Sequence, residues 1–411
     1  MNESLVVSAP ATSRRQAFGL SGRPALYLLA SLVVSLLAGS AAPTPLYATY
    51  QERWGFTPIT TTVVFGAYAV AVLVALLVLG RLSDHVGRRP VLLAALAVQA
   101  ISLVVYATAG DVPELLAARI IQGLSTGAAL GAIGAGMLDI DRPRGTLANA
   151  VSPGTGTGLG SILSALAVRF LPEPTHLIYL VLLGVVIVQT AGVALMRETV
   201  TRSRGALSSL RPEIGLPHTV RTHLLAAAPV LFAVWALAAL YGALGPALVQ
   251  ALTGSRDVVL GGLSLTVLAA FAVAAIFALY TTKARTVMLV GIGALVAGVG
   301  VTLVALTVNS PAVFFAGTVV SGVGFGSGFQ GGIRTVVPRV AAHERAGVLS
   351  LLFVVSYLGL GVPAVAAGFL AVHGPGLIGA ARYYGAALIV LAALALLALI
   401  RSERQEGRNQ P

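Results

Sequence analysis

Long apolar runs with few or no charged residues recur along the whole chain, and they constrain its fold more than any other feature. A helix needs about 20 apolar residues to cross about 30 Å of hydrocarbon. Twelve runs of this kind follow one another between residues 25 and 400. Because 57% of the 411 residues are hydrophobic and only 10% are charged, the chain lacks the polar surface of a soluble domain. The sequence therefore predicts an all-α protein that crosses a membrane twelve times.

The predicted spans fall into two sets of six on either side of a polar segment. This segment, residues 197–223, is basic and contains Pro212 and Pro217, so we expect a linker. Two six-helix bundles are therefore predicted at residues 25–196 and 224–400, with terminal tails at residues 1–24 and 401–411. The expected spans are 25–47, 59–79, 91–109, 113–138, 145–171, 176–196, 224–252, 258–280, 286–308, 312–334, 346–372 and 377–400.

Arginine and lysine residues gather in alternate loops between these spans. The intervening loops hold only Arg53, Arg169 and Arg256, with Arg382 just inside the last span. Loops rich in arginine and lysine stay on the cytoplasmic side of a membrane. The pattern predicts a multi-pass protein of the cytoplasmic membrane with both termini in the cytoplasm. The net charge of +12 reflects this topology and does not indicate nucleic-acid binding.

The residue types that hold metals and redox cofactors are missing or dispersed. The chain contains no cysteine, which excludes disulfides, thiolate metal sites and thiol nucleophiles. Its six histidines are scattered over loops and helix ends without the spacing of a metal site on one helix. We therefore expect no metal and no cofactor. A membrane-embedded enzyme is not expected either, because it would need clustered acids, histidines or cysteines within the spans.

The loop between the second and third predicted spans carries the most specific motif. It reads Gly80-Arg81-Leu82-Ser83-Asp84-His85-Val86-Gly87-Arg88-Arg89. This sequence resembles the Gly-x-Leu-small-Asp-x-x-Gly-Arg-Arg/Lys signature of the major facilitator superfamily. The resemblance implies the major facilitator fold, in which two pseudo-symmetric six-helix bundles rock about a central cavity to transport a solute.

The same resemblance implies that the motif is a conformational latch. Asp84 is expected to face the amino-terminal end of the eleventh span and to hold the outward-open state, because a carboxylate is favoured at that partly positive helix end. Arg88 and Arg89 are expected to pair with Asp139 or Asp141 after the fourth span. The alternative is a solvated loop whose arginines only set the orientation. The predicted latch comprises Gly80, Asp84, Gly87, Arg88, Arg89 and Asp139.

A polar stripe marks the fourth predicted span. Arg119, Gln122 and Thr126 share one helix face, and they resemble a second motif of the superfamily with an arginine before a Gln-Gly pair. An arginine within a span costs roughly 2.5–3.5 kcal/mol on insertion scales, so it predicts a functional site. It is expected to hold an anionic substrate or to act on a nearby carboxylate. The alternative is an arginine that reaches the outer interface or pairs with Glu114 or Asp111.

The fifth span and the second half hold the remaining candidates. In the fifth span a proline followed by alternating glycines partly resembles the Gly-Pro-x-x-Gly-Gly motif of drug/proton antiporters, and plain glycine packing is the alternative. Helix flexibility is assigned to Pro153, Gly154, Gly156 and Gly158. Cavity roles in substrate binding or coupling are assigned to Tyr241, Gln330 and Tyr357, and ordinary packing of the tyrosines is the alternative.

These features predict a monomeric secondary transporter that exports small amphipathic molecules, such as drugs, against protons. No acid lies at mid-depth in a predicted span, and Glu52 and Glu114 near the outer mouth are the nearest candidates for the proton carrier. Facilitated diffusion therefore stays open. The alternatives are transport of a sugar or an organic anion attracted by Arg119, and a membrane sensor or scaffold that moves no solute. The expected partners are a small-molecule substrate, protons and the lipid bilayer.

Overall fold

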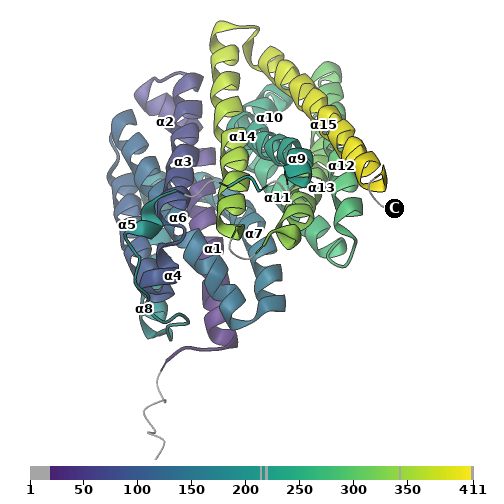
Figure 1. Ribbon diagram of the computed structural model, residues 1–411. Helices are drawn as coiled ribbons and strands as arrows, with labels where there is room; N and C mark the ends of the chain where they lie inside the picture. Colours follow the sequence, from purple (N-terminus) through teal and green to yellow (C-terminus); the bar gives the residue numbers. More distant parts are fainter. Residues whose placement is uncertain (1–18, 213–214, 218–220, 342–343, 409–411) are drawn as a thin grey trace, which may run out of the picture.

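The computed structural model describes residues 19–212, 215–217, 221–341 and 344–408, and the predicted all-helical membrane fold is confirmed over these ranges (Figure 1). Its only β feature there is one isolated bridge between Leu20 and Met196. The first half comprises α1 (Arg23–Ala41), α2 (Pro43–Trp54), α3 (Pro58–Leu79), α4 (Leu82–Val86), α5 (Arg88–Thr108), α6 (Val112–Ile140), α7 (Arg142–Phe170) and α8 (Pro174–Leu195). The second half comprises α9 (Arg221–Ala239), η3 (Leu240–Leu244), α10 (Gly245–Thr253), α11 (Val258–Ala278), α12 (Ala284–Val308), α13 (Pro311–Val336), α14 (Arg345–His373) and α15 (Gly376–Arg408). Two short 3₁₀ turns are η1 (Ser208–Leu210) and η4 (Val337–Arg339).

Several helices join into single crossings. The helix α1 continues into α2, and α9 continues through the π-helical turn η3 into α10. Within the described residues, eleven crossings are long and apolar enough to span a membrane. The helix α7 occupies the place of the remaining predicted span and is 29 residues long, but its many glycine, serine and threonine residues lower its hydropathy.

Prolines and short polar side chains set the starts of the helices. Proline occupies the first or second position of α3, α6, α8 and α13, where its missing N–H would have no partner in any case. Asp111, Asp141 and Ser310 then cap α6, α7 and α13 by accepting a hydrogen bond from a backbone N–H of the first turn. The long apolar helices are therefore interrupted at loops that the local sequence dictates.

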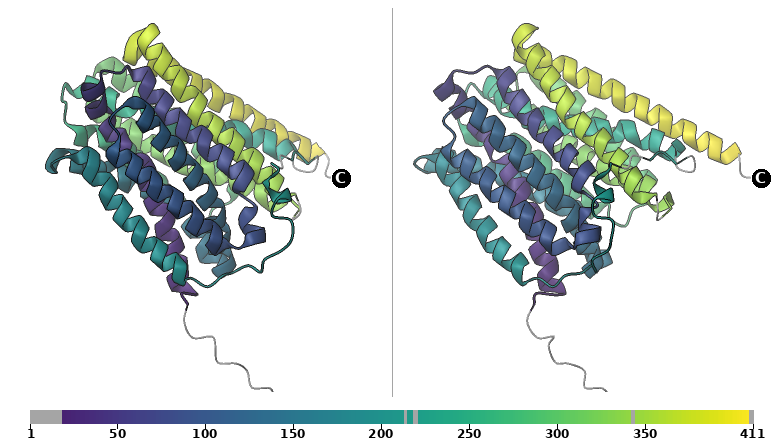
Figure 2. Two further views of the ribbon diagram at one scale, coloured as in Figure 1. Left: turned by 90° about the vertical axis from the view of Figure 1, so that its left-hand side faces the viewer. Right: turned by 60° about the vertical axis from the view of Figure 1, so that its left-hand side comes forward.

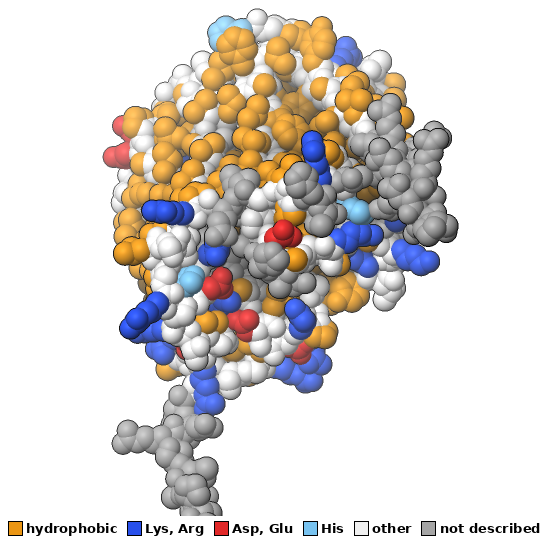
Figure 3. Space-filling view, in the orientation of Figure 1, with side chains coloured by type: hydrophobic (Ala, Val, Ile, Leu, Met, Phe, Trp, Pro, Cys, Tyr) orange, Lys and Arg blue, Asp and Glu red, His pale blue; other side chains and the backbone are white. Residues whose placement is uncertain are grey.

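Basic side chains distinguish the two ends of the helix bundle. We call the end that carries α4 and residues 197–212 the linker end, and the opposite end, with residues 55–57, 109–111 and 171–173, the far end. In Figure 3 lysine and arginine side chains gather over the lower part of the molecule, toward the linker end, and the flank above is mostly hydrophobic. This exposed apolar flank is what a helix bundle presents to lipid.

The two halves meet along two pairs of helices, α3 with α14 and α7 with α11 (Figure 2 shows the first pair side by side). A Cβ placed on Gly368 of α14 would lie 2.1 Å from Thr62, and one on Gly361 would lie 3.5 Å from the Cβ of Ala69. Thr62 lies near the start of α3 at the far end, and Ala69 lies at the middle of the helix. The halves thus touch closely from the far end to the middle of the bundle.

The second pair, α7 with α11, also meets between the middle of the bundle and the far end. Ser161 donates a hydrogen bond to the carbonyl of Gly262 at 2.9 Å, and Thr266 donates one to the carbonyl of Gly158 at 3.3 Å. At the far end an ion pair joins Arg169, in the last turn of α7, to Asp257, the N-cap of α11. Hydrogen bonds and a salt bridge therefore close the far end across the two halves.

Candidate functional site

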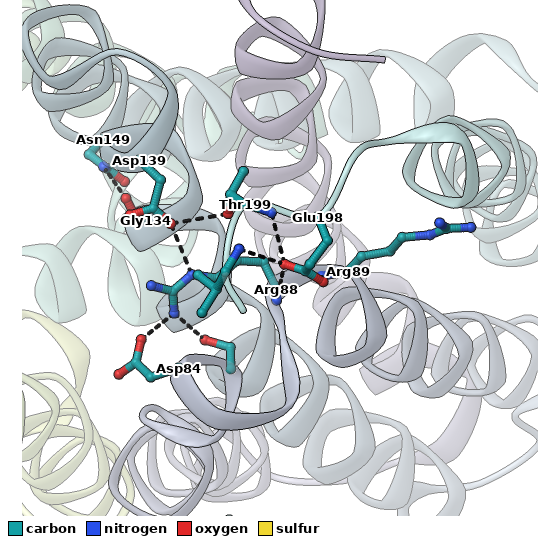
Figure 4. Close-up of polar contacts among 10 residues, drawn as sticks. Asp84, Arg88, Arg89, Gly134, Asp139, Asn149, Glu198 and Thr199 are labelled. Atoms are coloured by element: carbon teal, nitrogen blue, oxygen red, sulfur yellow. Dashed lines mark hydrogen bonds and ion pairs between the residues drawn. The ribbon is translucent and has the colours of Figure 1, made fainter. Parts of the chain in front are cut away.

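A charged cluster lies at the linker end around Arg88, which is 6% exposed (Figure 4). Its guanidinium donates to the hydroxyl of Ser83 at 2.7 Å, to the carboxylate of Asp84, and through Nε to Asp139 at 3.2 Å. Asp139 also accepts a hydrogen bond from Thr199 at 3.1 Å. The cluster therefore ties α4, α5, the end of α6 and the start of the linker together within the first half.

Glu198 belongs to this cluster, and sequence reasoning did not select it. Its carboxylate accepts hydrogen bonds from the backbone N–H groups of Arg88 at 2.8 Å and Arg89 at 3.0 Å. These are the first N–H groups of α5, where the helix dipole favours a negative charge. The preceding residue, Gly87, has a φ of 103°, a conformation that favours glycine. No local motif signals Glu198, because its partners lie more than 100 positions earlier in the chain.

The structure places the predicted latch residues as follows. Arg88 pairs with Asp139, whereas the Arg89 side chain extends away from the cluster (Figure 4). Asp141 instead caps α7 and pairs with Arg144 at 2.9 Å, and these contacts hold the pKa of Asp141 below its usual range, with the backbone N–H of Arg144 as the largest cause. Asp84 pairs with Arg88 in its own half and is about half exposed. Its contact with the start of α14 stays a prediction.

A second cluster surrounds Arg119 in α6, which is 1% exposed. The guanidinium donates to the Tyr47 hydroxyl at 2.6 and 3.2 Å, to the Ser40 carbonyl at 2.8 Å and to the Gln122 side-chain oxygen at 3.0 Å. Its Cζ atom also lies 5.4 Å from the ring centroid of Tyr68, within the range of a cation–π contact. We call these five residues the arginine cage.

Further aromatic residues support the arginine cage. Tyr106 donates a hydrogen bond to the Gln122 oxygen at 3.0 Å and stacks on Tyr179 at a centroid distance of 4.6 Å. Tyr50 in turn donates to the Tyr179 hydroxyl at 3.2 Å. Sequence reasoning missed these tyrosines. The spacing of Tyr47, Tyr50 and Trp54 along one helix face was the available signal, because residues three and four apart share a face.

No carboxylate neutralises Arg119 in the described part of the chain. Glu114 accepts a hydrogen bond from the backbone of Gly110, and Asp111 accepts one from the backbone of Glu114. No aspartate or glutamate is buried among the residues whose burial is described. Arg119 therefore neither reaches the outer interface nor pairs with these acids. Instead, hydroxyl, carbonyl and amide oxygens solvate its charge.

The candidates of the second half do not join the arginine cage. The Tyr241 hydroxyl lies in the π-helical turn and bonds Thr302 at 2.7 Å and Ser321 at 3.2 Å, all within its own half. Gln330 is buried one helical turn after Gly326, which packs on Ala272 of α11, so its face of α13 points toward α11. Tyr241 and Gln330 therefore lie apart from Arg119 and Gln122, which meet in the arginine cage.

Tyr357 is the predicted cavity residue that lies where the halves meet. It is buried in one hydrophobic cluster with Tyr68 of α3, and Trp235 of α9 packs against this cluster. The ring centroids of Trp235 and Tyr357 are 4.9 Å apart. Tyr68, itself a member of the arginine cage, thus connects Arg119 to aromatic residues of the second half.

The glycines of α7 face two different neighbours. A Cβ on Gly156 or Gly160 would lie within 2.4 Å of a backbone oxygen of α1, whereas Gly154 and Gly158 face α11 of the other half. Only glycine allows backbones to approach this closely. Pro153 lies inside the helix before this run. A flexing role for these four residues stays a prediction, and their packing role follows from the contacts.

A bundle of long apolar helices with buried polar side chains defines a polytopic membrane protein. The family model of the Major Facilitator Superfamily matches residues 27–284, so the chain belongs to this superfamily. A triacylglyceride transporter of Mycobacteroides abscessus is 37% identical over 113 residues, which are 27% of this chain and 20% of that protein. An uncharacterized transporter of Rickettsia bellii is 39% identical over 74 residues, 18% of either chain. The matches thus span about a fifth of each relative.

Solved structures share the fold over nearly the whole chain. A bacterial homolog of the human lysosomal transporter Spinster, in an inward-facing and occupied conformation, has a TM-score of 0.70 at 14% identity and covers 92% of this chain and 96% of its own. A mutant of the nucleoside transporter NupG scores 0.68 at 14% identity, covering 91% and 98%. The human organic anion transporter MFSD10 scores 0.67 at 18% identity, also covering 91% and 98%. These likenesses, at 14–18% identity, show that the chain has the fold of these transporters.

Proposed function

We propose that the protein exports small amphipathic molecules across the cytoplasmic membrane by alternating access, driven by protons. In this proposal the linker end faces the cytoplasm, and the structure is the state whose pathway opens on that side. The single observation that carries the proposal is the position of the contacts between the halves. Thr62 with Gly368, Ser161 with Gly262 and Arg169 with Asp257 all lie toward the far end.

The charge distribution supports this orientation. Basic residues of the described loops concentrate at the linker end, as the positive-inside rule requires for the cytoplasmic side. The far end holds few, and one of them, Arg169, is paired with Asp257. An amphipathic cargo is supported by the aromatic character of the region between the halves and by the lack of a buried acid there.

An organic anion is the second candidate cargo. Arg119 favours it, because a buried guanidinium without a carboxylate partner leaves a net positive charge inside the first half. A competing anion would need to displace Tyr47 or Gln122 from the guanidinium. Amphipathic cargo is therefore proposed first and an anion second.

A solute screen in inverted membrane vesicles tests the proposed function. With a pH gradient imposed, amphipathic dyes are expected to accumulate, and collapsing the gradient is expected to abolish the accumulation. Accumulation that ignores the gradient would replace proton coupling with facilitated diffusion. Movement of no solute at all would favour a sensor or scaffold and overturn the proposal.

Engineered disulfides test the alternating-access part, since the chain has no cysteine of its own. Ala69→Cys with Gly361→Cys, and Gly158→Cys with Ala269→Cys, would place Cβ atoms about 3.5 and 3.3 Å apart, near the separation that disulfides need. Oxidation of either pair is expected to stop transport, and reduction is expected to restore it. Each single-cysteine variant is the matched control. Transport that continues with the pair fully oxidised would show that the two helices joined by that pair need not separate.

A further inference from the structure

Aromatic side chains of α3, α9, α13 and α14 pack together where the two halves meet. Trp235 stands at the centre of this group. Its ring centroid lies 4.9 Å from that of Tyr357, 5.8 Å from Phe329 and 6.3 Å from Phe325, with both phenylalanines edge-on. Tyr68 of the first half is buried in the same cluster as Tyr357. We call these five residues the aromatic seam.

Trp235 carries an unmet hydrogen-bond donor in the aromatic seam. Its Nε1 atom is buried and has no partner, although the indole ring as a whole is only partly buried. The indole N–H can only donate, and a buried donor without an acceptor destabilises the protein. Native structures leave few such groups, so this one requires an explanation. A bound molecule with an acceptor oxygen would satisfy it.

The charges near the aromatic seam restrict the kind of molecule that fits. The Arg119 guanidinium lies 5.4 Å from the ring centroid of Tyr68, and no acid is buried among the residues of described burial. A cation in the seam would meet this positive charge without a compensating carboxylate. An anion would find the guanidinium already donating to Tyr47, Ser40 and Gln122. An uncharged molecule meets neither difficulty.

We infer that the aromatic seam binds flat, uncharged aromatic molecules that carry a carbonyl-type acceptor, and that the Trp235 N–H selects for this acceptor. Such a molecule would pack against the rings of Trp235, Phe329 and Tyr357 and accept the hydrogen bond from Nε1. This inference rests on the proposed function insofar as it names the cargo class. Binding itself requires no transport, so it is measured separately.

Tryptophan fluorescence gives a direct readout, because Trp54 and Trp235 are the only two tryptophans in the sequence. In purified full-length protein with Trp54→Phe, all tryptophan emission comes from Trp235. The probes are fluorenone, fluorene, which has a closely similar ring system without the carbonyl, and the cation N-methylacridinium. Fluorenone is expected to quench Trp235 saturably and to bind about tenfold tighter than fluorene, with the acridinium binding most weakly.

A substitution at the donor completes the test. Equilibrium dialysis is expected to show that Trp235→Phe binds fluorenone and fluorene equally, whereas Trp54→Phe keeps the tenfold preference. The emission of Trp54 in the Trp235→Phe protein reports partition of the probes into detergent, because Trp54 stacks on Tyr50 outside the seam. The comparison in the Trp54→Phe protein leaves Trp235 intact, so it remains decisive if Trp235→Phe does not fold.

The inference is overturned if fluorenone shows no preference over fluorene, if the preference persists in Trp235→Phe, or if the acridinium binds tightest. Its failure is distinguishable from that of the proposed function. If fluorenone binds as expected but no solute moves in vesicles, only the proposed function is contradicted. If a solute moves but fluorenone is not preferred over fluorene, only this inference is contradicted.

Discussion

Arg119 carries its charge in the interior of a helix bundle with oxygen atoms as its only hydrogen-bond partners among the described residues. Four donated hydrogen bonds to Tyr47, Ser40 and Gln122 replace the water that the guanidinium loses on burial. The planar fork of arginine suits this arrangement, because its N–H groups point in fixed directions. Lysine has the same charge but cannot reach several acceptors at once in this geometry.

The first prediction concerns the arginine cage. Arg119→Ala is expected to lower the free energy of unfolding by about 2–5 kcal/mol, because it leaves the buried Gln122 oxygen and Ser40 carbonyl without their charged donor. The free energy of unfolding of Arg119→Lys should lie between those of Arg119→Ala and the parent protein. Thermal unfolding in detergent and transport in vesicles measure the effects. Arg382→Ala is the control, since Arg382 is exposed and makes one bond, to the Leu306 carbonyl. Equal stability of Arg119→Ala and the parent protein would contradict the solvating role.

The second prediction concerns Glu198. Glu198→Gln keeps one acceptor oxygen but removes the negative charge from the start of α5, so a loss of about 0.3–1 kcal/mol is expected. Thermal unfolding at low and high salt measures it, and the difference should shrink at high salt because screening weakens a partly exposed charge. Glu52→Gln is the matched control on an exposed glutamate away from this cluster. An unchanged melting temperature at low salt would show that the cap is dispensable.

At the scale of helices, α7 acts as a divider with two glycine faces. Gly156 and Gly160 fix it to α1 in its own half, and Gly154 and Gly158 lie against α11 of the other half. The two faces therefore have different roles in the proposed cycle. The face on α1 stays in contact, whereas the face on α11 must separate and return.

This division yields the third prediction. Gly160→Ala would bring a Cβ within 2.3 Å of the Ala38 carbonyl oxygen, so α1 and α7 must move apart and the yield of folded protein should fall several-fold. Gly184→Ala is the matched control, because nothing lies within 4 Å of that position. Size-exclusion chromatography of equal membrane amounts measures both. A normal yield of Gly160→Ala would mean that α1 and α7 can move apart at this position without loss of folded protein.

The sequence was sufficient to predict the helices and the superfamily, because apolar run length and loop chemistry are local. It also placed Arg88 near Asp139 and Arg119 beside Gln122. The partners Glu198 and Tyr47 were missed because they come from other elements, and only the fold brings them together. The cavity role of Gln330 stays a prediction, because the sequence of one helix does not indicate which neighbour each of its faces meets.

For the molecule as a whole, the far-end ion pair biases the balance between the two states of the proposed cycle. Arg169 and Asp257 are partly exposed, with side chains 51% and 29% accessible. Such pairs contribute about 0.2–1 kcal/mol. A bias of that size is small enough for the halves to separate in each cycle.

The fourth prediction follows from this bias. Arg169→Ala is expected to slow oxidation of the Ala69→Cys and Gly361→Cys pair by about two- to fivefold, because the far end spends less time closed. Arg169→Lys, which keeps the positive charge and leaves the Asp257 cap intact, should retain most of the rate. Quenched oxidation followed by gel electrophoresis measures it. A rate unaffected by Arg169→Ala, or lowered equally by Arg169→Lys, would remove the pair from the closing mechanism.

The weak hydropathy of α7 also bears on how the chain is made. A segment so rich in glycine, serine and threonine gains little by leaving the translocation channel for lipid alone, since its backbone is sparsely covered by aliphatic side chains. Its sites of contact, α1 on one side and α11 on the other, become available at different times during synthesis. The fifth crossing is thus expected to wait beside the channel until α11 has emerged, so that the first half matures only when the second half has begun to enter the bilayer.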